Sequence, residues 1–107
     1  MKYEIHPDGT MTLNPAYTEI LRLDKLLTEK GIDHKTERLF DGYRVGVNYD
    51  GREIGDAVQH YFSYGNEENL LETMGFDEYY VIGRRTVEDV MAVVEEAIER
   101  KRERIKR

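Results

Sequence analysis

The sequence predicts a single α+β domain, and three observations lead to that class. Apolar residues recur at helical spacing in two stretches, they alternate with polar residues in the stretches between, and Asp-Gly pairs separate the alternating stretches. A chain of 107 residues can bury one core but not two. The predicted order is an N-terminal β-hairpin, a helix, a three-stranded antiparallel meander, a short helix, a short strand and a C-terminal helix.

The first two elements are predicted from turn and cap residues. Residues 2–13 alternate around Pro7-Asp8-Gly9, a turn in which proline fixes φ and glycine accepts a positive φ, so they predict a hairpin. Asn14 is a capping residue followed by Pro15, which is favoured at the first helical position. The helix should end at Gly31, a residue that favours the left-handed conformation at a helix C-terminus.

The meander is predicted from residues 35–40, 43–49 and 54–62, whose alternation is typical of strands. Asp41-Gly42 and Asp50-Gly51 separate these strands, and Asp-Gly pairs favour two-residue type I′ turns. Pairing across those turns predicts one face directed to the core. Its members are Phe40, Tyr43, Val45, Val47, Ile54 and Val58.

Three further elements complete the prediction. Asn66 should cap a short helix over residues 67–74, with Leu70, Leu71 and Met74 directed inward, and residues 79–82 should form a short strand. Thr86 and Asp89 have the spacing of a capping box, which predicts the start of the last helix. Its apolar stripe is Val87, Val90, Met91, Val94, Ala97 and Ile98, and we expect fraying beyond Glu99.

Composition excludes several classes of site. The chain has no cysteine, so disulfides, cysteine nucleophiles and thiolate metal sites are excluded. It has no apolar run long enough to span a membrane and no apolar segment of a signal peptide at its start, so we expect a cytoplasmic protein. His6, His34 and His60 lack the spacing of metal ligands. We predict no catalytic residue, no metal and no cofactor.

The net charge of −6 is unevenly distributed. Residues 100–107 carry six basic side chains and one acidic side chain, whereas residues 1–99 carry 10 basic and 21 acidic ones, a charge of −11. We therefore predict a domain over residues 1–99 and a basic tail over residues 100–107. An acidic body should attract basic protein surfaces and repel nucleic acid, so direct nucleic-acid binding is not expected.

Two candidate binding patches stand out. A protein-binding surface is predicted from tyrosine anchors beside acidic residues: Asp56, Tyr61, Tyr64, Glu67, Glu68 and Glu72. The alternative is a sponge that sequesters a signalling nucleotide, because two arginines directly before a helix N-terminus favour phosphate and neighbouring tyrosines can stack a base. Its residues are Tyr79, Tyr80, Arg84, Arg85 and Thr86. In ordinary structural roles, the arginines would pair with surface carboxylates and the tyrosines would pack on the core. A third alternative is self-association into a homo-oligomer.

The sequence also contains two longer blocks. The first block consists of residues 14–27, Lys30-Gly31-Ile32 and residues 38–42. The second block consists of Phe62-Ser63-Tyr64-Gly65, residues 70–72 and Met74-Gly75. These blocks resemble a group of small proteins encoded by phages and prophages of gut bacteria, whereas residues 79–85 do not match it. The resemblance implies an anti-defence role of the anti-CRISPR kind, in which the protein binds a host defence factor through a basic surface of that factor and inhibits it.

Overall fold

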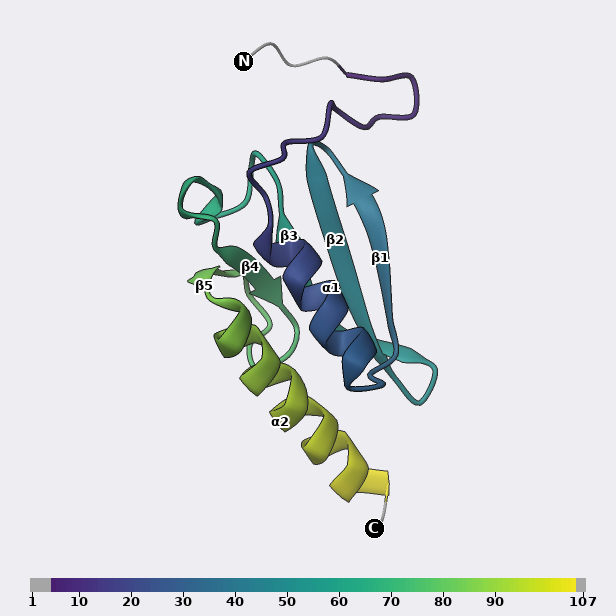
Figure 1. Cartoon of the computed structure of the whole chain (residues 1–107). Coiled ribbons are helices and arrows are strands. Elements are labelled where there is room, and N and C mark those ends of the chain that lie inside the picture. Colours follow the sequence, from purple (N-terminus) through teal and green to yellow (C-terminus); the bar gives the residue numbers. More distant parts are fainter. Residues whose placement is uncertain (1–4, 106–107) are drawn as a thin grey trace.

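The computed structural model describes residues 5–105 and shows an α+β fold in two layers. Five antiparallel strands form one sheet in the order β1-β2-β3-β4-β5, and both α-helices cover the same face of it (Figure 1). The elements are α1 (Glu19–Glu29), β1 (His34–Leu39), β2 (Gly42–Tyr49), β3 (Arg52–Gln59), the 3-10 turn η1 (Asn66–Glu68), β4 (Leu71–Met74), β5 (Ile82–Arg85) and α2 (Val87–Ile105). The α+β prediction is confirmed, while several predicted elements differ.

The start of α1 differs from the prediction. Asn14 caps only a local turn, in which its Oδ1 accepts the Ala16 N–H at 3.0 Å, and the helix begins at Glu19. Its first free N–H groups are bound from the β3–β4 loop, where Asn69 Oδ1 accepts the N–H groups of Thr18 (3.2 Å) and Glu19 (3.3 Å). The cap of α1 is therefore supplied by a residue that is distant in the sequence but adjacent in the fold.

The end of α1 confirms the prediction at Gly31. Gly31 has a φ of +68°, and its N–H donates to Thr28 O at 3.1 Å. The N–H of Ile32 donates to Leu27 O at 2.9 Å, which completes a Schellman motif and directs the chain into β1.

The two meander turns have different outcomes. The Asp50-Gly51 turn is confirmed, with positive φ at both residues, as a type I′ turn requires. The first turn is Phe40-Asp41, so the predicted Asp41-Gly42 turn is displaced by one residue. Gly42 instead opens β2 so close to β3 that a side chain there would overlap the Gln59 carbonyl oxygen.

A bulge in β3 explains one of the two errors in the predicted core face. Val47 pairs with Gly55 and Asn48 with Glu53, so Ile54 is an extra residue and every later position of β3 changes face. Val58 therefore lies on the face away from the helices. Ala57 and Gln59 take inward places, and the prediction is wrong for Val58 and for Phe40, which lies in a turn. It is confirmed for Val45 and Val47, which are buried, and for Tyr43 and Ile54, which pack against the core.

The predicted helix over residues 67–74 is wrong. Helical structure is limited to η1, because Asn69 takes a left-handed φ of +58° and turns the chain into β4. Thr73 then pairs with Ala57 and is buried, whereas Met74 is 47% exposed rather than directed inward. The backbone hydrogen bonds that this segment forms with the free edge of β3 outweigh its local preference for a helix.

Two other predicted elements are reduced or displaced. Residues 2–4 lie outside the described part of the chain, and the described part of the predicted hairpin contains a single bridge, Ile5 with Met11, around the confirmed turn at Gly9. The predicted strand over residues 79–82 is wrong in position, because β5 begins at Ile82 and the three residues before it are exposed.

The last helix agrees with the prediction at its start and along its apolar stripe. The Thr86 Oγ1 accepts the Asp89 N–H at 3.0 Å and Asp89 Oδ2 accepts the Thr86 N–H at 3.1 Å, which is the predicted capping box. The stripe packs into the core between helices and sheet. Fraying past Glu99 is not observed, since α2 continues to Ile105. Ion pairs across the two helices, Arg22–Glu88 and Lys30–Glu95, hold them side by side.

Candidate functional site

At one end of the sheet, β1 turns into β2 and β3 enters the loop of residues 60–70 (Figure 1). Four aromatic side chains from these two connections contact one another. The ring centroids of Phe40 and Phe62 are 5.1 Å apart, those of Phe40 and His60 are 5.0 Å apart, and those of Tyr61 and Phe62 are 5.1 Å apart. Phe62 is 61% exposed, and Tyr64, two residues further on, is 63% exposed. We call Phe40, His60, Tyr61 and Phe62 the aromatic patch. Exposed, mutually contacting rings of this kind are typical anchors of protein interfaces.

Hydrogen bonds to the main chain hold the loop in one conformation. The buried Asp41 carboxylate accepts the Tyr61 N–H at 2.8 Å, and the Asn66 side-chain amide donates to the carbonyl groups of Tyr61 (2.6 Å) and Ser63 (2.8 Å). The Ser63 hydroxyl accepts the His60 N–H and donates to the His60 carbonyl, so it closes the turn. The rings are therefore presented by a loop that is already ordered.

His60 forms the buried base of the aromatic patch. Its Nδ1 accepts the Phe62 N–H at 3.1 Å, so the neutral ring carries its proton on Nε2. Burial lowers the pKa of His60, although the charges of Glu72 and Asp41 act in the opposite direction. The imidazole is thus neutral at pH 7, and the patch keeps an apolar character.

The acidic residues predicted for the site lie beside this patch and on the open face of the sheet. Arg44 lies at the centre of that face, and its guanidinium contacts Asp56 at 2.9 Å, Glu53 at 2.6 Å and Glu37 at 3.6 Å. Burial raises the pKa of Asp56 despite this cation. Glu37 also lies 3.6 Å from the Lys35 ammonium, so two cations face these three carboxylates and the nearby Glu72, and the face remains negative. Glu72 extends this charge toward the loop, and its Oε1 accepts the Tyr64 N–H at 3.0 Å.

The structure brings most of the predicted protein-binding residues to one region. Tyr61, Tyr64, Glu67 and Glu68 lie on the loop of residues 60–70, and Glu72 follows on β4. Glu68 is 3.5 Å from Arg84, whereas Glu67 is exposed and forms no ion pair within residues 5–105. Asp56 lies further along β3, where its charge still interacts with that of Glu72.

The predicted nucleotide patch is not assembled. Arg84 is exposed and contacts Glu68, whereas the largely buried Arg85 binds the Asp77 carboxylate at 2.7 Å. The N-terminus of α2 is closed by the capping box of Thr86 and Asp89. Tyr79 and Tyr80 are exposed in the β4–β5 loop, outside any strand.

The described residues also contain no group of three or more His, Asp or Glu side chains that could hold a metal ion. His34, for example, is engaged by the Asp24 carboxylate at 2.9 Å and by the Ile32 carbonyl at 2.7 Å. Such contacts order the end of α1 and the start of β1.

Sequence reasoning missed Phe40, Phe62 and His60 as members of the site. Phe40 and Phe62 fall within predicted strands, because alternation alone does not distinguish the last strand residue from the first turn residue. The signal that could have found them is a phenylalanine directly before Asp-Gly, and another directly before Ser-Tyr-Gly.

Comparison of the chain with family models, with curated proteins and with solved structures gives no match. Within residues 5–105, neither helix combines the length and the apolar character that crossing a membrane requires.

Proposed function

We propose that this chain is a non-enzymatic inhibitor of phage type that binds a host defence factor, as anti-CRISPR proteins do, and that the aromatic patch and Tyr64 anchor the contact. The observation that carries the proposal is the exposure of these rings on a loop whose main chain is already fixed by Asp41, Ser63 and Asn66. An ordered loop loses little conformational entropy on binding, so the contact energy of its rings is largely retained. Aromatic side chains are also the commonest hot spots of protein interfaces.

The carboxylates around the patch suggest the chemistry of the partner. Glu72 binds the Tyr64 N–H from β4, Asp56 lies on the neighbouring β3, and the exposed Glu67 lies on the loop that carries Tyr61 and Phe62, in a chain of net charge −6. A negative rim of this kind favours a basic surface and accelerates its approach. Defence proteins that hold nucleic acid offer such surfaces in their binding channels, and occupation of a channel would inhibit them.

The proposal predicts that the double substitution Phe62→Ser with Tyr64→Ser strongly weakens binding without unfolding the protein. Both side chains are mostly exposed, so the free energy of unfolding should change by no more than about 0.5 kcal/mol for Tyr64. It should fall by about 0.5–1.5 kcal/mol for Phe62, which also loses its ring contacts with Phe40 and Tyr61. Loss of two anchors should weaken binding by at least about 30-fold. Host proteins retained by the immobilised chain would be identified and purified, and each dissociation constant would be measured by calorimetry.

Tyr79→Ser with Tyr80→Ser is the matched control, because it removes two exposed aromatic rings from a different loop. The control should bind as the native chain does. A partner that binds the Phe62/Tyr64 variant as tightly as the native chain contradicts the proposal, as does a partner whose activity is unchanged at saturation. If light scattering shows that the native chain is a dimer and that the Phe62/Tyr64 variant is a monomer, the patch would be assigned to self-association.

A further inference from the structure

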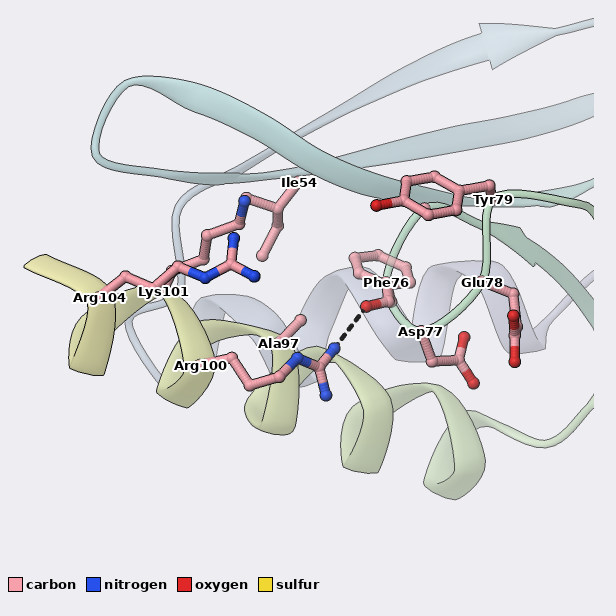
Figure 2. A pocket seen from close by; sticks show the side chains of 10 residues that line it. Ile54, Phe76, Asp77, Glu78, Tyr79, Ala97, Arg100, Lys101 and Arg104 are labelled. Atoms are coloured by element: carbon pink, nitrogen blue, oxygen red, sulfur yellow. Dashed lines mark hydrogen bonds between the residues drawn. The ribbon is translucent and has the colours of Figure 1, made fainter.

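A cavity of about 250 Å³ lies between the C-terminal half of α2 and the β4–β5 loop (Figure 2). Its apolar wall is formed by Ile54, Phe76 and Ala97, which come from β3, the loop and the helix. Ile54 lies near the start of β3 and His60 just past its end, so the cavity and the aromatic patch occupy opposite ends of that strand. The two sites are thus separate surfaces of the molecule.

Two contacts keep the cavity open. The Phe76 ring is buried over Gly55, where any β-carbon would lie 2.6 Å from the ring, so the loop is held close to the sheet. The Arg100 guanidinium donates a hydrogen bond of 2.7 Å to the Phe76 carbonyl, which fixes the same loop to α2 (Figure 2). The walls are therefore tied to the sheet on one side and to the helix on the other.

One end of the cavity is cationic, which is unusual in this acidic chain. Lys101 and Arg104 are three residues apart and so share a face of α2, and neither forms an ion pair within residues 5–105. Their charged groups reach toward Ile54, and the Tyr79 hydroxyl is directed to the same space (Figure 2). The carboxylates of Asp77 and Glu78 lie at the other end of the cavity, where Asp77 is occupied by Arg85.

We propose that this cavity binds a small aromatic phosphate of the nucleoside monophosphate class. Two unpaired cations side by side match the charge of a phosphate dianion, and the guanidinium can hold two of its oxygens. The flat body of the ligand would lie against Ile54 and Phe76, while the Tyr79 ring, which is 99% exposed, is free to stack on it. A volume of about 250 Å³ is just below the range of drug-sized pockets, roughly 300–1,000 Å³, and so selects a small ligand.

The experiment is a titration of the ¹⁵N-labelled full chain with adenosine monophosphate, followed by two-dimensional NMR. We expect saturable shifts of the amides of residues 76–79 and 97–104. Adenosine alone and inorganic phosphate alone should each bind at least tenfold more weakly, because each makes only part of the contacts. Lys101→Gln with Arg104→Gln should weaken the nucleotide at least tenfold and leave the other amide signals in place.

The matched control is Lys25→Gln with Arg102→Gln, which removes two exposed cations that do not line the cavity. It should bind the nucleotide as the native chain does. The site is refuted if millimolar nucleotide leaves the amides of residues 76–79 and 97–104 unshifted, or if the Lys101/Arg104 variant binds as tightly as the control. If inorganic phosphate binds as tightly as the nucleotide, the cavity does not recognise the aromatic base, and that part of the proposal is wrong.

Discussion

Asn69 shows how one side-chain amide can connect distant parts of this chain. Besides the N–H groups of Thr18 and Glu19, its Oδ1 accepts the Gln59 side-chain amide at 2.7 Å, and its Nδ2 donates to the Thr18 hydroxyl at 2.7 Å. Glu19 and Asn69 are 50 residues apart. The start of α1 and the loop that presents the aromatic patch are therefore stabilised by the same residue.

Asn69→Ala should lower the free energy of unfolding by about 2 kcal/mol, the upper range for loss of a helix cap, because the cap is lost and alanine disfavours the left-handed backbone. Urea denaturation measures this change. Asn69→Gly is the control for the backbone, since glycine adopts φ = +58° without strain, and it should recover only part of the loss. An alanine variant as stable as the native chain would show that the cap contributes nothing.

His60 predicts a pH dependence of stability. Its pKa in the folded chain is lowered by burial, so the folded state takes up a proton less readily than the unfolded state. The stability contributed by neutral His60 is therefore complete above the unfolded pKa of about 6.5 and is lost as the pH falls through the folded pKa. Denaturation between pH 8 and pH 5 should show native stability falling more steeply than that of His60→Gln. Parallel profiles would contradict this role.

The bulge in β3 determines what the sheet buries. It directs Ala57 and Gln59 to the helices and leaves Gly55 under the Phe76 ring. Through this ring the β4–β5 loop packs against the sheet. Gly55 therefore supports both the core and the cavity, since Phe76 belongs to each.

Gly55→Ala should lower the free energy of unfolding by about 1–3 kcal/mol, because a methyl group 2.6 Å from the Phe76 ring forces the ring or the strand to move. Thermal and urea unfolding measure the loss. The double variant with Phe76→Leu should be less destabilised than the sum of the two single variants, since the smaller side chain leaves room for the methyl group. Additive losses would place the strain elsewhere.

The long helices could be predicted because their signals are local: α1 has its own Gly31 stop, and α2 has its own capping box. β4 could not be predicted, since the acidic residues after Asn66 do favour a helix and only the free edge of β3 selects a strand. The aromatic patch was predicted in part, through Tyr61. The other residues of the patch, and those that line the cavity, are brought together by the packing of loops. The spacing of residues along the sequence does not reveal that packing.

At the scale of the whole molecule, the two candidate sites lie at opposite ends of β3, the aromatic patch near Glu67 and Glu68 and the cavity near Lys101 and Arg104. Reversing Glu67→Lys with Glu68→Lys should weaken binding to a basic partner at least tenfold at low salt. At 1 M salt, where the Debye length is about 3 Å, the difference should shrink. Calorimetry at two salt concentrations measures both values.

Glu29→Lys with Glu103→Lys is the matched control for charge, because both carboxylates are exposed and neither forms an ion pair within residues 5–105. If it weakens binding as much as the Glu67/Glu68 variant, net charge rather than the position of the charge governs association. Equal effects of the Glu67/Glu68 variant at both salt concentrations would exclude electrostatic attraction.

The strand order has a kinetic consequence. Each strand after β1 pairs with the strand that precedes it in the chain, so each addition to the sheet closes a short segment. Chains whose contacts are mostly local fold faster than those that must first join distant segments. We therefore expect the sheet to grow in sequence order as the polypeptide leaves the ribosome, while α1 becomes fully ordered only after Asn69 has emerged.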